Sequence, residues 1–94
     1  FPMTPAESKE ILQSLQSGRV CLIEHYRYYT GEIVCTQFHF HHMAEKYMSK
    51  NVEIHGNGEE TSHETYLDEK EMTKTLSRME YERVKGCLHS GKPY

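Results

Sequence analysis

The side chains best suited to bind a metal ion are crowded into the stretch FHFHHMAEKYM. It places His39, His41 and His42 within four positions. Two imidazoles in a His-x-His step, such as His39 and His41, can share a metal ion only where both side chains point to the same side of the backbone. A third ligand could come from His25 or from Glu45, and this mixture of nitrogen and oxygen donors suits zinc or nickel. A metal-binding regulatory protein is therefore one hypothesis for the chain.

The same stretch also fits a junction between a strand and a helix. Polar and apolar residues alternate up to Phe40, and a helical spacing follows from about residue 41 to residue 50. The residues predicted to line one side of that helix are Phe40, Met43, Ala44, Tyr47 and Met48. On this interpretation Phe38, Phe40, Met43 and Tyr47 contact the core, and the three histidines face water. We favour this interpretation and keep the metal site as the alternative.

Two Cys-x-x-x-His pairs, Cys21 with His25 and Cys35 with His39, suggest a zinc site on paper. If both pairs lie on strands, the four-residue step spans about 13 Å. Ligands of one zinc ion must each lie within about 2.0 to 2.3 Å of the metal. The spacing therefore argues against a site of two cysteines and two histidines.

No motif typical of an enzyme is present. The three cysteines, Cys21, Cys35 and Cys87, lie within apolar patterns and not at an exposed turn or helix start, where a thiolate would be stabilised. No serine has the glycine spacing of a nucleophile elbow, and HGNGEE lacks the lysine of a phosphate-binding loop. We therefore predict a non-enzymatic protein without a cofactor.

The stretch EHYRYYTGE carries the strongest signal for binding a partner. It contains Tyr26, Arg27, Tyr28 and Tyr29. If these residues form the end of a hairpin, aromatic side chains lie on both faces of it, and a domain of this size cannot bury both faces against its own helices. Tyrosine and arginine are enriched at binding hot spots. These four residues are the predicted partner-binding site, for another protein or for a second copy in a homodimer.

The elements that position these residues follow from local patterns. Thr4, Pro5 and Glu7 begin a helix that runs from about Pro5 to Gln16. Residues 19–29 and 32–40 form a hairpin around Thr30-Gly31. A two-residue loop would pair Tyr28 with Ile33 and Tyr26 with Cys35, whereas a bulged turn would shift the register by one residue. We favour the two-residue loop.

A second, more polar hairpin joins residues 52–55 to residues 60–66 around Gly56-Asn57-Gly58. Its second strand has few apolar residues, which predicts a position at the edge of the sheet. Capping patterns from Asp68 to Glu71 and from Ser77 to Glu80 then predict two short helices or one kinked helix. The predicted fold class is α+β, with N-terminal, middle and C-terminal helices packed on one face of an antiparallel sheet.

Length and composition limit the remaining possibilities. The chain has 94 residues, which is the size of one domain, and we place this domain at residues 4–92 and treat Phe1 and Pro2 as vector-derived. No apolar run is long enough to span a membrane or to serve as an export signal. Three cysteines are too few to staple a secreted miniprotein, so reduced thiols in the cytoplasm are expected.

The formal net charge of −3 argues against nucleic acid as the partner, because nucleic-acid binding proteins usually present a basic surface. Single-stranded nucleic acid stacking on the tyrosines remains an alternative. The hypothesis that we favour is a small acidic cytoplasmic protein that binds another protein as an adaptor or inhibitor. A phage-encoded regulator of a host protein would have this size and composition.

Overall fold

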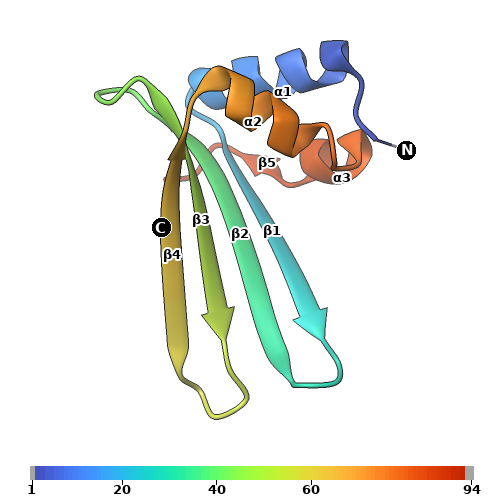
Figure 1. Cartoon of the computed structure of the whole chain (residues 1–94), viewed down its shortest axis with the longest axis vertical. Helices are drawn as coiled ribbons and strands as arrows, with labels where there is room; N and C mark the ends of the chain where they lie inside the picture. The colour runs from blue at the N-terminus through green and yellow to red at the C-terminus, as the bar shows by residue number, and fades with distance from the viewer. Residues whose placement is uncertain (1, 93–94) are drawn as a thin grey trace.

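Five antiparallel strands and three helices make up residues 2–92, the part of the chain that the computed structural model describes (Figure 1). In chain order they are α1 (Pro5–Gln16), β1 (Val20–Arg27), β2 (Glu32–His41), β3 (Lys46–Ile54), β4 (Glu60–Leu67), α2 (Glu69–Leu76), α3 (Tyr81–Gly86) and β5 (Leu88–His89). The predicted α+β class is confirmed.

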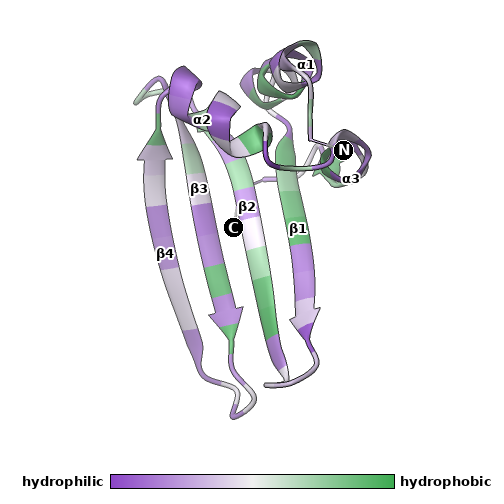
Figure 2. Ribbon diagram, turned by 45° about the vertical axis from the view of Figure 1, so that its right-hand side comes forward, coloured by the Kyte–Doolittle hydropathy of each residue, from purple (hydrophilic) through white to green (hydrophobic). Residues whose placement is uncertain are grey.

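The sheet has the strand order β4-β3-β2-β1-β5, so the four long strands form a simple meander. The three helices gather at one end of the strands, and the hairpin turns after β1 and after β3 lie at the other end (Figure 1). Figure 2 shows that the helices leave the strands uncovered toward the hairpin end. We call the face that carries the helices the helix-side face and the opposite one the open face.

Helix α1 forms where the sequence predicted it. Thr4 and Glu7 make a capping box: each backbone N–H donates to the side chain of the other residue, at 2.9 and 3.2 Å. Ile11, Leu12 and Leu15 form the buried stripe of the helix. The capping bonds fix where the helix starts, and burial of the stripe attaches it to the sheet.

The core lies between the helices and the helix-side face. The buried sheet residues in it are Cys21, Ile23, Phe38 and Tyr47, and the helices contribute Ile11, Leu12, Leu15, Met72, Leu76 and Val84. Met3 also belongs to the core, and its backbone N–H donates to the Met79 carbonyl at 3.0 Å. Pro2 is exposed, and the expectation for Phe1 lies outside the described residues.

The first hairpin exists, but its predicted register is wrong. Tyr26 lies opposite Ile33, and Arg27 lies opposite Glu32, so the loop has four residues instead of two. Gly31 has φ of 68°, and its N–H donates to the Arg27 carbonyl at 2.9 Å, which closes the longer loop. Because the error is two residues, an even number, every side chain keeps its predicted face. Cys21 and His25 therefore point to one face of the sheet and Cys35 and His39 to the other, which also argues against a shared zinc site.

The helix predicted for residues 41–50 is wrong. Strand β2 continues to His41, a four-residue turn follows, and β3 begins at Lys46. Phe40 and Tyr47 fit both patterns, because they are also direct cross-strand partners on the helix-side face. Met43 is 94% exposed in the turn and makes no core contact, and Met48 points to the open face. Strand β3 is a central strand, and its backbone N–H and C=O groups are paired with β2 on one side and with β4 on the other.

The second hairpin and the C-terminal helices agree more closely with the prediction. Strand β4 lies at the edge of the sheet, as its polar sequence predicted. Asp68 and Glu71 form a capping box that begins α2. Ser77 does not begin a helix: it is the C-cap of α2, and α3 starts after Glu80 without a side-chain cap. Two short helices are therefore present instead of one kinked helix.

Each of the three cysteines is a free thiol. Burial, and to a lesser degree Cys87, raises the pKa of the Cys21 thiol to about 12. None of the helices within residues 2–92 has the length and apolar character that crossing a bilayer requires.

Candidate functional site

The four residues predicted to bind a partner gather at the hairpin end of β1. Tyr28 and Tyr29 lie in the loop and are 86% and 102% exposed, and Tyr26, at the end of the strand, is 50% exposed. The rings of Tyr26 and Tyr28 meet edge to face with centroids 5.0 Å apart. We call Tyr26, Arg27, Tyr28 and Tyr29 the tyrosine tip. The helices lie at the other end of the sheet and do not cover it (Figure 1).

Arg27 is held against the neighbouring strand. Its Nη1 lies 3.4 Å from Glu32 Oε2, and the two residues are cross-strand partners. An exposed ion pair of this kind contributes at most about 1 kcal/mol. It nevertheless holds the guanidinium toward Glu32 on the helix-side face, so the tip presents a cation on that face and the Tyr26 ring on the open face.

A groove of about 390 Å³ lies on the open face beside the tip. Its lining residues come from all four long strands: Leu22, Glu24, Cys35, Gln37, Lys50, Val52, Ile54 and Glu60. Alternation along the strands explains this composition, because Leu22, Cys35 and Val52 point away from the helices and have no second layer to bury them. The groove therefore offers apolar surface to a binding partner.

Acidic groups dominate the rim of the groove. Burial raises the pKa of the Cys35 thiol, and the carboxylates of Glu24 and Glu60 raise it further. Both carboxylates therefore act electrostatically on the thiol within the groove. The cation on this surface, Lys50, lies 3.9 Å from Glu64. A basic partner would find a favourable potential here.

The groove and the tip form one surface. Tyr26 lies opposite Ile33, and Ile33 lies opposite Ile54, which gives a row of apolar side chains across β1, β2 and β3 on the open face. Ile33 is exposed, and Ile54 also lines the groove. The sequence indicated the tip but not the groove, because the groove depends on which face the helices leave open.

The histidines proposed as metal ligands are not brought together. His39 and His41 do point to the same face, but His25 points to the helix-side face and His42 packs edge to face on Phe40. His41 Nδ1 accepts a hydrogen bond from the Ala44 N–H at 3.1 Å, inside the turn. Glu45, at φ of 53°, is exposed in the same turn. Among residues 2–92, the three histidines and Glu45 therefore form no group of three ligand atoms close enough to share one ion.

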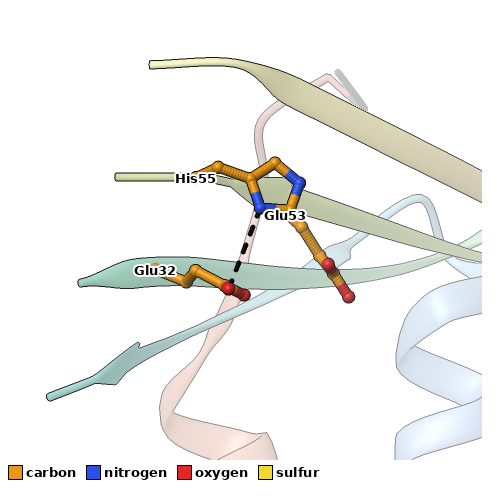
Figure 3. Close-up of side chains that lie close together, drawn as sticks. All are labelled: Glu32, Glu53 and His55. Atoms are coloured by element: carbon orange, nitrogen blue, oxygen red, sulfur yellow. Dashed lines mark ion pairs between the residues drawn. The ribbon is translucent and has the colours of Figure 1, made fainter. Parts of the chain in front are cut away.

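A different group of potential ligands, which the sequence did not indicate, lies on the helix-side face. Glu32, Glu53 and His55 place one ligand atom each within 4.8 Å of one another (Figure 3). Glu53 lies in β3 and His55 directly follows it, and their spacing of two residues in extended chain is a usable signal for a shared face. The position of Glu32 beside these two residues depends on the register of β2 and β3, which the sequence does not reveal. Within residues 2–92 this is the one such group that the structure shows.

Comparison with protein families, with curated proteins and with solved structures gave no match to this chain. The geometry of the tyrosine tip and of the groove is therefore the basis for inferring a function.

Proposed function

We propose that this protein is a non-enzymatic interaction module, an adaptor or inhibitor, that binds a partner protein through the tyrosine tip and the adjoining groove. One observation carries the proposal: Tyr28 and Tyr29 are almost fully exposed at an end of the sheet that no helix covers. Large aromatic side chains bury much area for little conformational entropy when they bind, which is why they recur at interaction hot spots.

The chemistry of the surface restricts the partner. An apolar side chain of the partner would fit the groove between Leu22, Val52 and Ile54. Basic side chains around it would meet Glu24 and Glu60 at the rim. We therefore expect a protein segment that presents an apolar side chain flanked by lysine or arginine. The net charge of −3 favours such a partner over nucleic acid.

The first step of the test is to identify the partner by crosslinking from a defined position in the tip. A photo-crosslinking amino acid placed at Tyr29 should link to the partner in the source cells, and the crosslinked segment should be apolar and basic. Affinity is then measured with the purified pair. We expect Tyr26→Ala and Tyr28→Ala each to weaken binding at least tenfold, which corresponds to about 1.4 kcal/mol. Glu24→Lys should weaken binding by reversing the charge at the rim.

Met43→Ala is the matched control. Met43 is as exposed as the tip residues but lies in the turn at the helix end of the sheet, so its replacement should leave affinity unchanged. Equal affinities for wild type and both tyrosine variants, with the fold intact, would disprove the assignment. Crosslinks only to a second copy of the chain would replace the partner protein by a homodimer. Crosslinks to single-stranded nucleic acid, with affinity that falls steeply with salt, would favour the nucleic-acid alternative.

A further inference from the structure

Strands β2 and β3 bring three potential metal ligands together near the hairpin end of the helix-side face. Glu53 in β3 and His55 directly after β3 point to this face, and Glu32 points to it from β2, one residue beyond the Ile33–Ile54 pair (Figure 3). His55 Nδ1 lies 3.8 Å from Glu32 Oε1, and all three ligand atoms lie within 4.8 Å of one another. The ligands are already assembled before any ion is considered.

These separations are close to those that a metal ion requires. Two ligand atoms about 2.0 to 2.2 Å from a zinc ion in tetrahedral geometry are about 3.3 to 3.6 Å apart. The distance between His55 and Glu32 exceeds this range by only a few tenths of an ångström. The side chains of Glu32 and Glu53 are partly exposed, so their rotation can bring the carboxylate oxygens to these separations without any movement of the strands.

His55 is oriented for this role by groups outside the cluster. Its Nε2 lies 3.3 Å from the Thr61 hydroxyl oxygen. Its backbone N–H donates to the Glu59 carbonyl at 2.8 Å, and its carbonyl accepts from the Gly58 N–H at 2.9 Å. With a hydrogen on Nε2 directed at Thr61, Nδ1 turns its lone pair toward the two carboxylates. Three electron-pair donors that face one another are an arrangement that a bound metal ion would stabilise.

We propose that Glu32, Glu53 and His55 form a binding site for a divalent transition-metal ion, with water completing the coordination. One imidazole nitrogen and two carboxylate oxygens form a donor set that zinc accepts and that manganese also accepts. The imidazole ligand favours zinc over magnesium, because magnesium prefers an all-oxygen shell. This site shares no residue with the histidine cluster of the sequence, and none of its three ligands belongs to the tyrosine tip.

Arg27 gives the site a distinctive property. Its guanidinium lies 3.4 Å from Oε2 of Glu32, the same carboxylate whose Oε1 faces His55. A metal ion bound to Glu32 must therefore tolerate a nearby positive charge or displace it. Removing this charge with Arg27→Gln should tighten metal binding several-fold, because a nearby like charge weakens the binding of a cation. No other role of Arg27 predicts a gain in metal affinity.

The experiment uses the full chain without a histidine tag, stripped with a chelator, at pH 7.5. Calorimetric titration with zinc chloride should show one ion bound per chain, with weaker binding of manganese and none of magnesium at the same concentration. Glu53→Gln and His55→Gln should each lower zinc affinity at least tenfold. Binding to the native state should also raise the melting temperature of the wild type.

Two controls separate this site from other histidines. His63→Gln changes an exposed histidine on the helix-side face of β4 and should leave zinc affinity unchanged. In NMR spectra, substoichiometric manganese should broaden the amide signals of residues 32 and 53–55 first. Zinc affinity that survives Glu53→Gln and His55→Gln but is lost in the His39→Gln, His41→Gln double variant would overturn the proposal. The absence of any zinc binding would overturn it as well.

Discussion

The side-chain amide of Gln16, at the end of α1, donates a hydrogen bond of 2.6 Å to the hydroxyl of Tyr47 in β3. The Tyr47 ring is buried against Phe40, with centroids 5.0 Å apart. Tyr47 thus joins the N-terminal helix to the centre of the sheet, in the part of the chain where the sequence predicted a helix. Burial raises the pKa of Tyr47, although the bond from Gln16 acts in the opposite direction.

The hydroxyl and the ring of Tyr47 should contribute differently to stability. Tyr47→Phe removes the hydrogen bond and should lower the free energy of unfolding by about 1 kcal/mol. Tyr47→Ala also removes the buried ring and should cost about 3 to 5 kcal/mol. Urea denaturation measures both values. Gln16→Ala is the matched variant, and its cost should resemble that of Tyr47→Phe. Equal costs for Phe and Ala at position 47 would contradict the buried position of the ring.

The turn between β2 and β3 can be distinguished from a helix by the sign of one substitution. Glu45 has φ of 53°, in the left-handed region that disfavours residues with a Cβ. Glu45→Gly should therefore keep or raise stability by up to about 1 kcal/mol. The same change inside a helix would cost about 1 kcal/mol. Thermal denaturation of Glu45→Gly shows which sign is correct. Ser49→Gly, within β3, is the control and should lower the stability.

Elements defined by local chemistry were predictable from the sequence. The capping boxes at Thr4 and at Asp68 each involve residues three positions apart, so the sequence contains both partners of every bond. The glycine turn between β3 and β4 is equally local. Such signals identified α1, the second hairpin and the start of α2.

The errors arose where non-local contacts decide the structure. Phe40 and Tyr47 satisfy both helical and strand spacing, and only the pairing of β3 with β2 and β4 selects the strand. The register of β1 and β2 sets Arg27 opposite Glu32 and so leaves four residues in the loop. No local pattern specifies this register. The group of Glu32, Glu53 and His55 depends on that same kind of register. The groove also escaped prediction, because it depends on which face of the sheet the helices leave open.

Cys21 should make stability sensitive to alkaline pH. Its thiol is buried beside the Val84 carbonyl, and burial raises its pKa from 9.0 to about 12. Between these values the unfolded chain loses the thiol proton and the folded chain retains it. The free energy of unfolding should therefore fall as the pH rises from about 9 toward 12. Cys21→Ala should be less stable at neutral pH because of its cavity, yet it should show a shallower alkaline decline in urea titrations. Parallel declines in the two proteins would rule out this linkage.

His39 should contribute the corresponding effect at acid pH. Burial, the neighbouring His41 and the cation of Lys50 lower its pKa from 6.5, and Glu64 acts in the opposite direction. A lowered pKa means that the unfolded chain binds the proton more readily than the folded one. The contribution of His39 to the free energy of unfolding should therefore decline as the pH falls below about 6.5. His39→Gln removes the titrating group and should flatten the stability profile between pH 7 and 5. Identical slopes for the wild type and His39→Gln would exclude His39 as the source.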